Sequence, residues 1–407
     1  MPSVMAGIRI LEVAEHTFVP AASAILAEWG AEVIKVEHVE RGDAMRGLAS
    51  TGVLPLTGGV HVILEHSNRG KKSIGLDLAQ PEGAQILYDL AKTCDVFLTN
   101  KNPGVRGRLH IDVDDIRAHN PNIIYVRGSG YGPKGPDADQ GGYDFLAFHC
   151  RSGNGMASKA FEIDNMPPPP APAYGDCIGA MTIAGAISTA LLYRERTGEA
   201  TVVDVSLLGT GMWAMSAAIA LSMQLNVPWL QGPSSRDKVR NPLTGTYKTK
   251  DGRWLGFSCL QYFHYWPDMC RVLGRPELVT DARFATSEDL SANAPAAAEI
   301  LVGEFGSRTF DEWLERLSDF KGQWAPCQDT LQVVDDPQAV ANGYVRELQT
   351  KEGNTFRLVT SPVQFNEEPT PPLRGPDFNE HGDEILSELL GIDWDTIVEL
   401  KVKGVVA

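Results

Sequence analysis

Residues 7–38, GIRILEVAEHTFVPAASAILAEWGAEVIKVEH, decide the fold of this chain. Ile8–Ala14 is an apolar run with strand character, and Glu32–Glu37 repeats it. Between them, Ala21–Trp29 has the composition of a buried helix and stops at Gly30, a residue common just after helix C-termini. A strand, a helix and a strand in this order predict a βαβ unit with parallel strands and a right-handed crossover.

The same alternation continues along the chain. It predicts strands at Ser73–Leu78, Asp95–Leu98 and Ile123–Arg127, a helix from Pro81 to about Thr93 and a short helix near Asp114–His119. After a proline-rich loop at 163–175, it predicts a helix at Cys177–Arg196, a strand at Ala200–Val205 and an apolar helix ending near Leu225. The predicted fold class is therefore α/β, with a doubly wound sheet.

Composition changes after residue 226, which predicts a second, smaller α+β domain. Pro242–Trp254 has the pattern of a hairpin that turns at Lys250–Gly252, and helices are expected at 263–273 and 309–318. The last segment predicts a helix from about Asp335, a strand pair near 345–360 and a helical tail that carries Glu384, Glu388 and Leu390.

Charge and cysteine usage limit the class of protein. The 407 residues carry a formal net charge of -16, which disfavours binding to nucleic acid or to anionic membranes through bulk electrostatics. The six cysteines contain no CxxC pair, and no secretory signal precedes the first strand, so we expect reduced thiols and a cytoplasmic location. Two apolar stretches, 177–193 and 206–227, approach the about 20 residues of a membrane span, but we expect buried helices of a soluble protein.

Several familiar catalytic signatures are absent from the sequence. The turn after the first strand, EHTFVPAAS, has no glycine, so the GxGxxG loop of dinucleotide-binding proteins cannot form there. No GxxxxGK[ST], GxSxG or HExxH motif occurs, and the nine histidines show no metal-ligand spacing. The doubly wound pattern therefore does not imply NAD or ATP.

Two basic clusters lie next to predicted strand ends, one before the strand at Ser73–Leu78 and the other after the strand at Asp95–Leu98. They are Asn68–Lys72, NRGKK, and Lys101–Arg108, KNPGVRGR. Each is placed to hold a diphosphate or a 3′-phosphate, because α/β sheets bind ligands at strand ends. A solvated charged edge is the competing interpretation.

Asp176 follows the proline-rich loop and precedes a long apolar helix. An aspartate in this position is suited to capping the helix, with its carboxylate accepting backbone N–H bonds. It is also suited to nucleophilic attack on a thioester, since helix N-terminal dipoles favour the ionised form. The neighbouring Cys177 has no evident histidine partner in the sequence, and we expect it to be an inert buried thiol.

The order of several motifs resembles the family III CoA-transferases, which include formyl-CoA, carnitine and bile-acid CoA-transferases and share their fold with the α-methylacyl-CoA racemases. The resemblance covers nearly the whole chain. It rests on residues 7–38 together with NRGKKSIGLDLAQPEG, DVFLTNKNPGVRGRL, NPNIIYVRGSGYGPKGP, GGYDFLAFHCRSG, YGDCIGA and NPLTGTYKTKDGRW.

The resemblance implies a large domain of Rossmann type formed by both ends of the chain, with a smaller α+β domain between them. The boundaries that follow are 1–205 for the first part of the large domain, 206–228 for a linker helix, 229–329 for the small domain and 330–407 for the return segment. It further implies a homodimer in which two such subunits interlock as rings.

Carried over residue by residue, the family's CoA site falls on nine positions of this chain. His38 stands where formyl-CoA transferase has an arginine. The nine are Thr17, Phe18, His38, Leu76, Ala79, Asn100, Lys101, Arg108 and Tyr143.

The family's catalytic aspartate matches Asp176 in YGDCIGA. The implied reaction moves CoA from an acyl-CoA thioester to a free carboxylic acid through an aspartyl anhydride and an aspartyl-CoA thioester. Coenzyme A is then substrate and product, and neither a metal nor a redox cofactor is needed. The expected partners are an acyl-CoA and an acceptor acid.

Two alternatives stay open at the level of sequence. The racemases add a histidine in a GHD-type segment, whereas Gly142-Tyr143-Asp144 has tyrosine there, and His149 lies six residues further on. This disfavours 2-methylacyl-CoA racemase or epimerase activity, because a tyrosine of ordinary pKa is a poor base at neutral pH. A CoA-binding protein without catalysis is disfavoured by the intact YGD segment. The glycine run that covers the aspartate in formyl-CoA transferase is absent between 226 and 262, which disfavours formyl/oxalate exchange. The segment YDFLAFHCRSG looks more like the transferases that act on larger carboxylates, such as aryl-lactate, mesaconate or bile-acid-type substrates.

Overall fold

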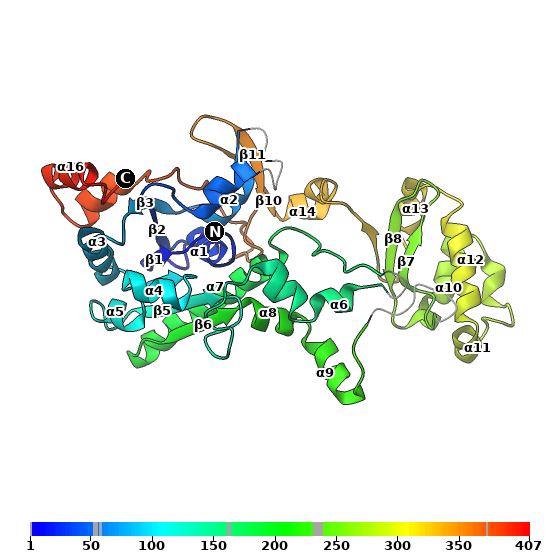
Figure 1. Cartoon of the computed structure of the whole chain (residues 1–407). Helices are drawn as coiled ribbons and strands as arrows, with labels where there is room; N and C mark the ends of the chain where they lie inside the picture. The colour runs from blue at the N-terminus through cyan, green and yellow to red at the C-terminus, as the bar shows by residue number, and fades with distance from the viewer. Residues whose placement is uncertain (1, 52–55, 57–58, 161–163, 231–238, 372) are drawn as a thin grey trace. The chain divides into compact units, whose positions relative to one another are not determined.

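The computed structural model describes residues 2–51, 56, 59–160, 164–230, 239–371 and 373–407. The chain divides into two compact units (Figure 1). The larger unit comprises Met1–Lys159, Ile163–Gln231 and Asn342–Ala407, and the smaller comprises Ala160–Glu162 and Gly232–Ala341.

A six-stranded parallel sheet forms the centre of the larger unit, as the βαβ pattern predicts. The strand order is β3-β2-β1-β4-β5-β6. Strands β2 and β3 are added on one side of β1, and β4, β5 and β6 on its other side, so the topological switch point lies between β1 and β4. In open α/β sheets a ligand site forms at this switch point, beside the carboxyl ends of the strands. The strands are β1 (Arg9–Val13), β2 (Glu32–His38), β3 (Lys72–Leu76), β4 (Val96–Thr99), β5 (Ile124–Ser129) and β6 (Val202–Ser206).

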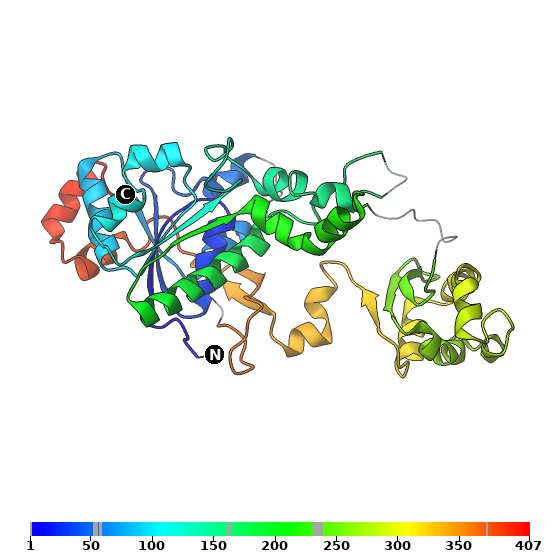
Figure 2. The same cartoon turned by 90° about the horizontal axis from the view of Figure 1, so that it is seen from below.

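Helices cover both faces of this sheet (Figure 2). On β1, Ile10 packs into the core formed with α1 and α7, whereas its neighbour Leu11 packs into the core on the opposite face. This two-sided burial explains why the strands are continuous apolar runs. The helices of the first face are α1 (Phe18–Glu28) and α7 (Tyr174–Thr197); those of the second are α3 (Pro81–Lys92), α5 (Val113–Arg117) and α16 (Trp394–Val402).

Several helices depart from the sequence-based expectation. Helix α1 begins at Phe18, before the predicted Ala21, and α4 (Pro103–Leu109) was not predicted. The apolar stretch after β6 forms two helices, α8 (Leu207–Ala214) and α9 (Ser216–Leu225), because the chain leaves helical geometry at Met215. By length and composition alone, α7 is long and apolar enough to cross a membrane, the one such helix in the described part of the chain.

The C-terminal segment returns to the larger unit. It contains the antiparallel pair β10 (Val345–Gln349) and β11 (Thr355–Val359), followed by α15 (Gly382–Glu384). Near the chain end, Val406 forms a bridge with Leu76 of β3. This bridge covers an edge of the sheet that would otherwise present unpaired backbone groups. The remaining helices of this unit are α2 (Val62–Asn68), α6 (Asn154–Ser158) and the short turns η1 (Ala44–Thr51), η2 (Phe145–Cys150) and η6 (Ile385–Leu389).

The smaller unit has its own core and an antiparallel sheet of order β7-β8-β9. The predicted hairpin is present, with β7 (Thr244–Lys248) paired to β8 (Trp254–Ser258). The indole Nε1 of Trp313, which is fully buried, donates to the carbonyl oxygen of Phe305 at 3.0 Å. The other elements are β9 (Trp324–Cys327), η4 (Pro276–Val279), η5 (Val333–Asp335), α10 (Tyr262–Leu273), α11 (Ser287–Ala292), α12 (Ala294–Phe305), α13 (Phe310–Leu317) and α14 (Pro337–Ala341); α11 and α12 were not predicted.

Candidate active site

The loop from β1 to α1 lies at the switch point and is held by side chains from distant segments. The Asn100 amide clamps the backbone of Glu15, donating to its carbonyl oxygen at 2.7 Å and accepting from its N–H at 3.2 Å. The carboxylate of Asp43 accepts the N–H of His16 at 3.0 Å. His16 has a φ of 68°, the left-handed conformation that usually favours glycine. These hydrogen bonds support a tight turn in a loop that has no glycine.

Asp43 belongs to a cluster of fully buried charges beneath this loop. Lys35 Nζ lies 2.8 Å from carboxylate oxygens of both Glu12 and Asp43, and Lys71 Nζ lies 2.9 Å from Glu12. Burial, opposed mainly by Glu12, lowers the pKa of Lys71 to about 7. Buried charges need such partners, since each alone would carry a large desolvation cost.

The placement of Lys71 shows that the first basic cluster was interpreted wrongly. Lys71 is inside the protein, Arg69 is buried in an ion pair with Glu28 at 2.7 Å, and Lys72 pairs with Glu384 at 2.7 Å. A phosphate site does not describe these residues, since Arg69 and Lys71 are buried in ion pairs, and only Lys72, whose side chain is 36% exposed, lies at a solvated edge. The cations were visible in the sequence, but the carboxylates that neutralise them come from other segments.

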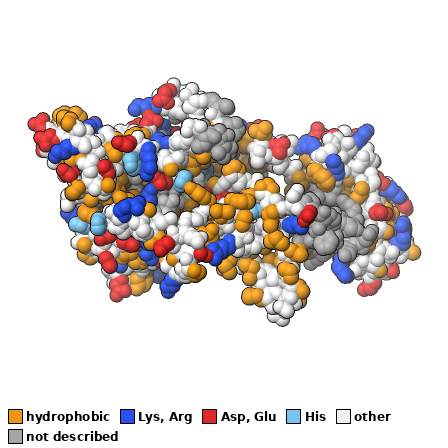
Figure 3. All heavy atoms as spheres, viewed as in Figure 1, with side chains coloured by type: hydrophobic (Ala, Val, Ile, Leu, Met, Phe, Trp, Pro, Cys, Tyr) orange, Lys and Arg blue, Asp and Glu red, His pale blue; other side chains and the backbone are white. Residues whose placement is uncertain are grey.

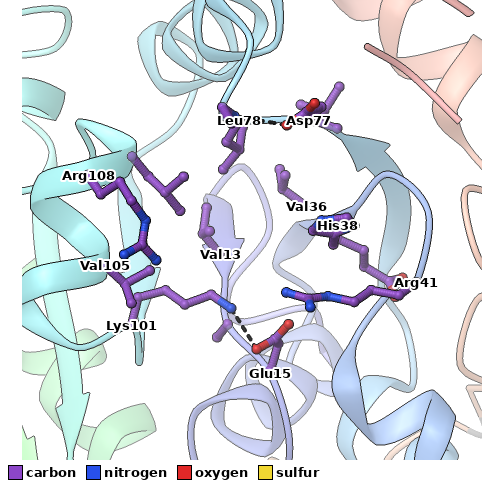
Figure 4. A pocket seen from close by; sticks show the side chains of 15 residues that line it. Val13, Glu15, Val36, His38, Arg41, Asp77, Leu78, Lys101, Val105 and Arg108 are labelled. Atoms are coloured by element: carbon purple, nitrogen blue, oxygen red, sulfur yellow. Dashed lines mark hydrogen bonds and ion pairs between the residues drawn. The ribbon is translucent and has the colours of Figure 1, made fainter. Parts of the chain in front are cut away.

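A pocket of about 240 Å³ opens at the carboxyl ends of β1, β2 and β3. Its lining includes the apolar side chains of Val13 and Val36 (Figure 4). Leu76 also lines it. Five of the predicted CoA-site residues line it: His38, Leu76, Ala79, Lys101 and Arg108.

The cations of this pocket come from opposite walls. Lys101 and Arg108 come from the segment after β4, whereas Arg41 reaches in from the turn after β2 (Figure 4). Lys101 Nζ is paired with Glu15 at 2.6 Å, but neither Arg41 nor Arg108 has a carboxylate partner among the described residues. Two such guanidinium groups are suited to binding phosphates.

Sequence reasoning missed Arg41. It lies three residues after His38, in the turn HVERGD that follows β2. The rule that drew attention to Lys101, a cation just beyond a strand end, applies equally to Arg41. Arg41 therefore supplies a guanidinium beside the position where His38 lacks one.

A second pocket, of about 480 Å³, shares Arg41, Lys101 and Arg108 with the first and extends to Asp176. Its lining includes four more of the predicted residues, Phe18, Asn100, Tyr143 and Asp176. Thr17 lines neither pocket, because it is buried at the N-terminus of α1.

Glycine backbones form part of the second pocket's wall. A Cβ atom on Gly130 would lie 2.6 Å from the Cα of Gly142, so a side chain at this crossing would clash with backbone. Tyr143 follows directly and rests edge-on against His16, with ring centroids 5.6 Å apart. The two pockets thus form a continuous path from the cations to Asp176.

Asp176 lies in the first turn of α7 but does not cap the helix. The capping interaction comes from Asp144, whose Oδ1 accepts the N–H of Gly175 at 3.1 Å. The residue at the cap position, Ala173, has a φ of 57° and makes no side-chain capping bond. Interpreting Asp176 as a cap is therefore wrong, and no described residue donates a hydrogen bond to its carboxylate.

Burial, together with the nearby Asp144 carboxylate, raises the pKa of Asp176 to about 7. Burial also raises the pKa of Asp144. A carboxylate with few hydrogen-bond donors and a raised pKa is a stronger base and nucleophile once ionised, because solvent does not stabilise its charge.

The neighbouring Cys177 does have a histidine partner, contrary to the sequence-based expectation. Its Sγ lies 3.9 Å from Nε2 of His66, and the cysteine is exposed rather than buried. Although the residue as a whole is exposed, partial desolvation of its thiol, with Asp176 close by, raises the pKa of Cys177 to about 11. Burial and Arg69 lower the pKa of His66 to about 4. Both shifts favour the neutral thiol and the neutral imidazole at physiological pH over the thiolate that nucleophilic chemistry needs.

Comparisons with known proteins agree with the resemblance in the sequence. The model of CoA-transferase family III matches residues 5–382. The (R)-2-hydroxy-4-methylpentanoate CoA-transferase of Clostridioides difficile is 30% identical over 404 residues, which cover 98% of each chain. The succinyl-CoA:glutarate CoA-transferase of Mus musculus is 29% identical over 98% of this chain and 89% of its own length. The crystal structure of a CAIB/BAIF family protein from Brucella suis matches with a TM-score of 0.81 at 26% identity, covering 96% of this chain and 100% of that one.

Proposed function

This chain belongs to CoA-transferase family III and acts as an acyl-CoA:carboxylate CoA-transferase, and we propose that Asp176 is the nucleophile of the reaction. The observation that carries the proposal is the position of this carboxylate. It lies at the end of a path lined by cations, without a hydrogen-bond donor among the described residues, in the first turn of α7.

The proposed reaction has two symmetrical halves. The Asp176 carboxylate attacks the acyl-CoA carbonyl and expels the CoA thiolate, which leaves a mixed anhydride. The thiolate attacks the aspartyl carbonyl, releasing the first acid and forming an aspartyl-CoA thioester. The acceptor carboxylate then attacks this thioester, the thiolate leaves again, and a second anhydride forms. Attack of the thiolate on the acceptor's acyl carbonyl yields the new acyl-CoA and restores Asp176.

CoA binding is proposed to follow the path from the first pocket to the second. Arg41 and Arg108, with Lys101, would contact the phosphates, and the apolar side chains of Val36 and Leu76 would receive the adenine. The remaining inherited contacts, which are Phe18, His38, Ala79, Asn100 and Tyr143, line the same path. Asn100 supports CoA binding in this scheme by holding the loop from β1 to α1, since its amide oxygen and its amide nitrogen both already bind the backbone of Glu15.

Racemase chemistry is not favoured, since it needs a second base opposite Asp176. Tyr143 occupies the position of the racemase histidine. His149, the next histidine along the chain, is buried, and its Nε2 donates to the carbonyl oxygen of Pro167 at 2.8 Å. It lines neither of the pockets described above.

Trapping the acyl-enzyme tests the proposal. With an acyl-CoA substrate, hydroxylamine should inactivate the enzyme, and mass spectrometry should find a hydroxamate on Asp176. Asp176→Ala should lower kcat by about a thousandfold or more and leave no hydroxamate. Asp395→Ala, in the exposed first turn of α16, is the matched control and should react like the wild type. Wild-type turnover by Asp176→Ala would refute the assignment.

A further inference from the structure

A third pocket, of about 470 Å³, adjoins Asp176. It shares Asp176 and Tyr143 with the second pocket and no other lining residue. Asp176 therefore stands at the junction between the path lined by cations and a separate recess. A thioester carbonyl placed at this carboxylate would have its CoA arm in the second pocket and its acyl group next to the third.

The wall of the third pocket is largely apolar. The segment Pro168–Pro172 contributes four prolines and Ala171, and Phe145 faces it with an exposed ring. Because proline fixes φ, this segment has few alternative conformations. A preformed apolar wall binds an apolar group without a large ordering cost.

The charges of the two pockets are opposite. The second pocket contains Arg41, Lys101 and Arg108, whereas the residues that line the third include no lysine, arginine or histidine. Its only ionisable carboxylates are Asp144 and Asp176. In the proposed reaction Asp176 is already an aspartyl-CoA thioester when the acceptor acid attacks, so a second carboxylate bound here would meet Asp144 and no lysine, arginine or histidine to pair with. This arrangement disfavours binding of a second carboxylate.

We propose that this proline-lined pocket holds the body of the carboxylic acid and selects monocarboxylic acids with an apolar chain or ring over dicarboxylic acids. The proposal rests on the proposed function, because the pocket is placed relative to Asp176 as the nucleophile. The proposal gives the segment Pro168–Pro172 a role in selecting the acid, a role that the motif comparison did not assign. Phe145 and Ala171 are specificity residues in this scheme.

Self-exchange measures acid preference without knowledge of the physiological donor. Each CoA ester is incubated with its own free acid carrying ¹³C, and label entering the ester is followed by mass spectrometry. 3-Phenylpropanoate and 4-methylpentanoate are compared with glutarate and succinate. The apolar acids should exchange with kcat/KM at least about tenfold higher than the dicarboxylic acids. Equal or better exchange with glutarate would overturn the pocket assignment.

Two variants test the lining directly. Ala171→Arg adds a cation to an exposed loop position and should shift the ratio toward glutarate by about tenfold or more, and Phe145→Ala should reduce exchange of the phenyl acid several-fold. Ala6→Arg, at an exposed turn before β1, is the control and should leave the ratio unchanged. An unaltered ratio in Ala171→Arg would overturn the proposal. Absence of exchange with every acid would instead refute the proposed function, and with it this inference.

Discussion

Asp144 and Asp176 are two partly buried carboxylates at the start of one helix, and the structure gives them different surroundings. Asp144 accepts the N–H of Gly175, so its oxygen has a partner in the folded protein. Asp176 has none among the described residues, and burial and Asp144 raise its pKa to about 7. Asp144 therefore caps the N-terminus of α7, whereas no hydrogen bond from a described residue occupies the carboxylate of Asp176.

This pKa predicts an acidic limb in the pH–rate profile. Asp176, as the proposed nucleophile, must be ionised to react, so kcat/KM should rise with pH and level off above about pH 7, rather than above the ordinary aspartate value near 4. Asp144→Asn removes the like charge but keeps an amide oxygen for the Gly175 N–H. The limb should then move to lower pH. An acidic limb that stays in place in this variant would contradict the role of Asp144.

The same pKa predicts that Asp176 destabilises the folded protein at alkaline pH. Its pKa is higher folded than unfolded, so the native state holds the proton more tightly and stability falls as pH rises from about 4 through 7. Asp176→Asn should raise the free energy of unfolding at pH 8 by about 1–2 kcal/mol, with a smaller gain at pH 5. Denaturant unfolding at both pH values measures this difference, and a gain independent of pH would contradict it.

At the scale of single elements, α7 depends on glycine at its first turn. A Cβ on Gly175 would lie 2.2 Å from the ring of Phe148 and 2.3 Å from Oδ1 of Asp144. Gly175→Ala should therefore displace the capping carboxylate, lower stability by about 2 kcal/mol and reduce kcat. Gly185→Ala, on the same helix with no atom within 4 Å of its Cβ, is the control and should gain about 0.5–1 kcal/mol. Equal stability of the two variants would refute the account of this helix start.

Arg41, which follows β2, and Arg108, in α4, lead to a separate prediction. Arg41→Ala and Arg108→Ala should each raise KM for a CoA ester by about tenfold with little change in kcat, because each removes a guanidinium that is proposed to bind phosphate far from the reacting carbon. The matching pantetheine ester, which lacks the nucleotide, should show no such change. Arg196→Ala, in the last turn of α7, is the control. A loss shared by the CoA and pantetheine esters would contradict phosphate binding.

At the scale of the whole molecule, α8 and α9 carry several exposed apolar residues. Trp213 is 76% exposed and Met223 is 73% exposed, in a region where hydrophobic side chains gather on the surface (Figure 3). Contiguous exposed apolar patches often mark interaction sites. They support the proposal, first drawn from the family resemblance, of an interlocked homodimer.

The proposed dimer predicts both the mass of the protein in solution and the rate at which its subunits exchange. Sedimentation should give twice the chain mass of 44.2 kDa. Because interlocked rings separate only on unfolding, two differently tagged dimers should not exchange subunits until denaturant is added. Trp213→Glu should weaken assembly, whereas Val402→Glu, at an equally exposed apolar position on α16, should not. A monomer at micromolar concentration, or rapid exchange in buffer, would exclude the interlocked form.

The sequence by itself determined the order and type of most elements of the sheet, because strand and helix periodicity and helix-ending glycines are local signals. Residues 7–38 were enough for the first βαβ unit, and motif order was enough for the family. Short elements were missed, since α4 has seven residues and α11 has six, even though Thr286 caps α11. The start of α1 has no side-chain cap, and the twelve-residue α12 was missed despite its length.

Only the tertiary structure decided which charged groups are available to a ligand. Lys71 and Arg69 are inside the protein, whereas Arg41, which the sequence did not single out, lines the pocket. Asp144 caps α7 from a segment about 30 residues away, which frees Asp176. Each of these outcomes depends on a partner distant in sequence. The charge and burial of a side chain in the fold are set by such partners, and local pattern contains no information about them.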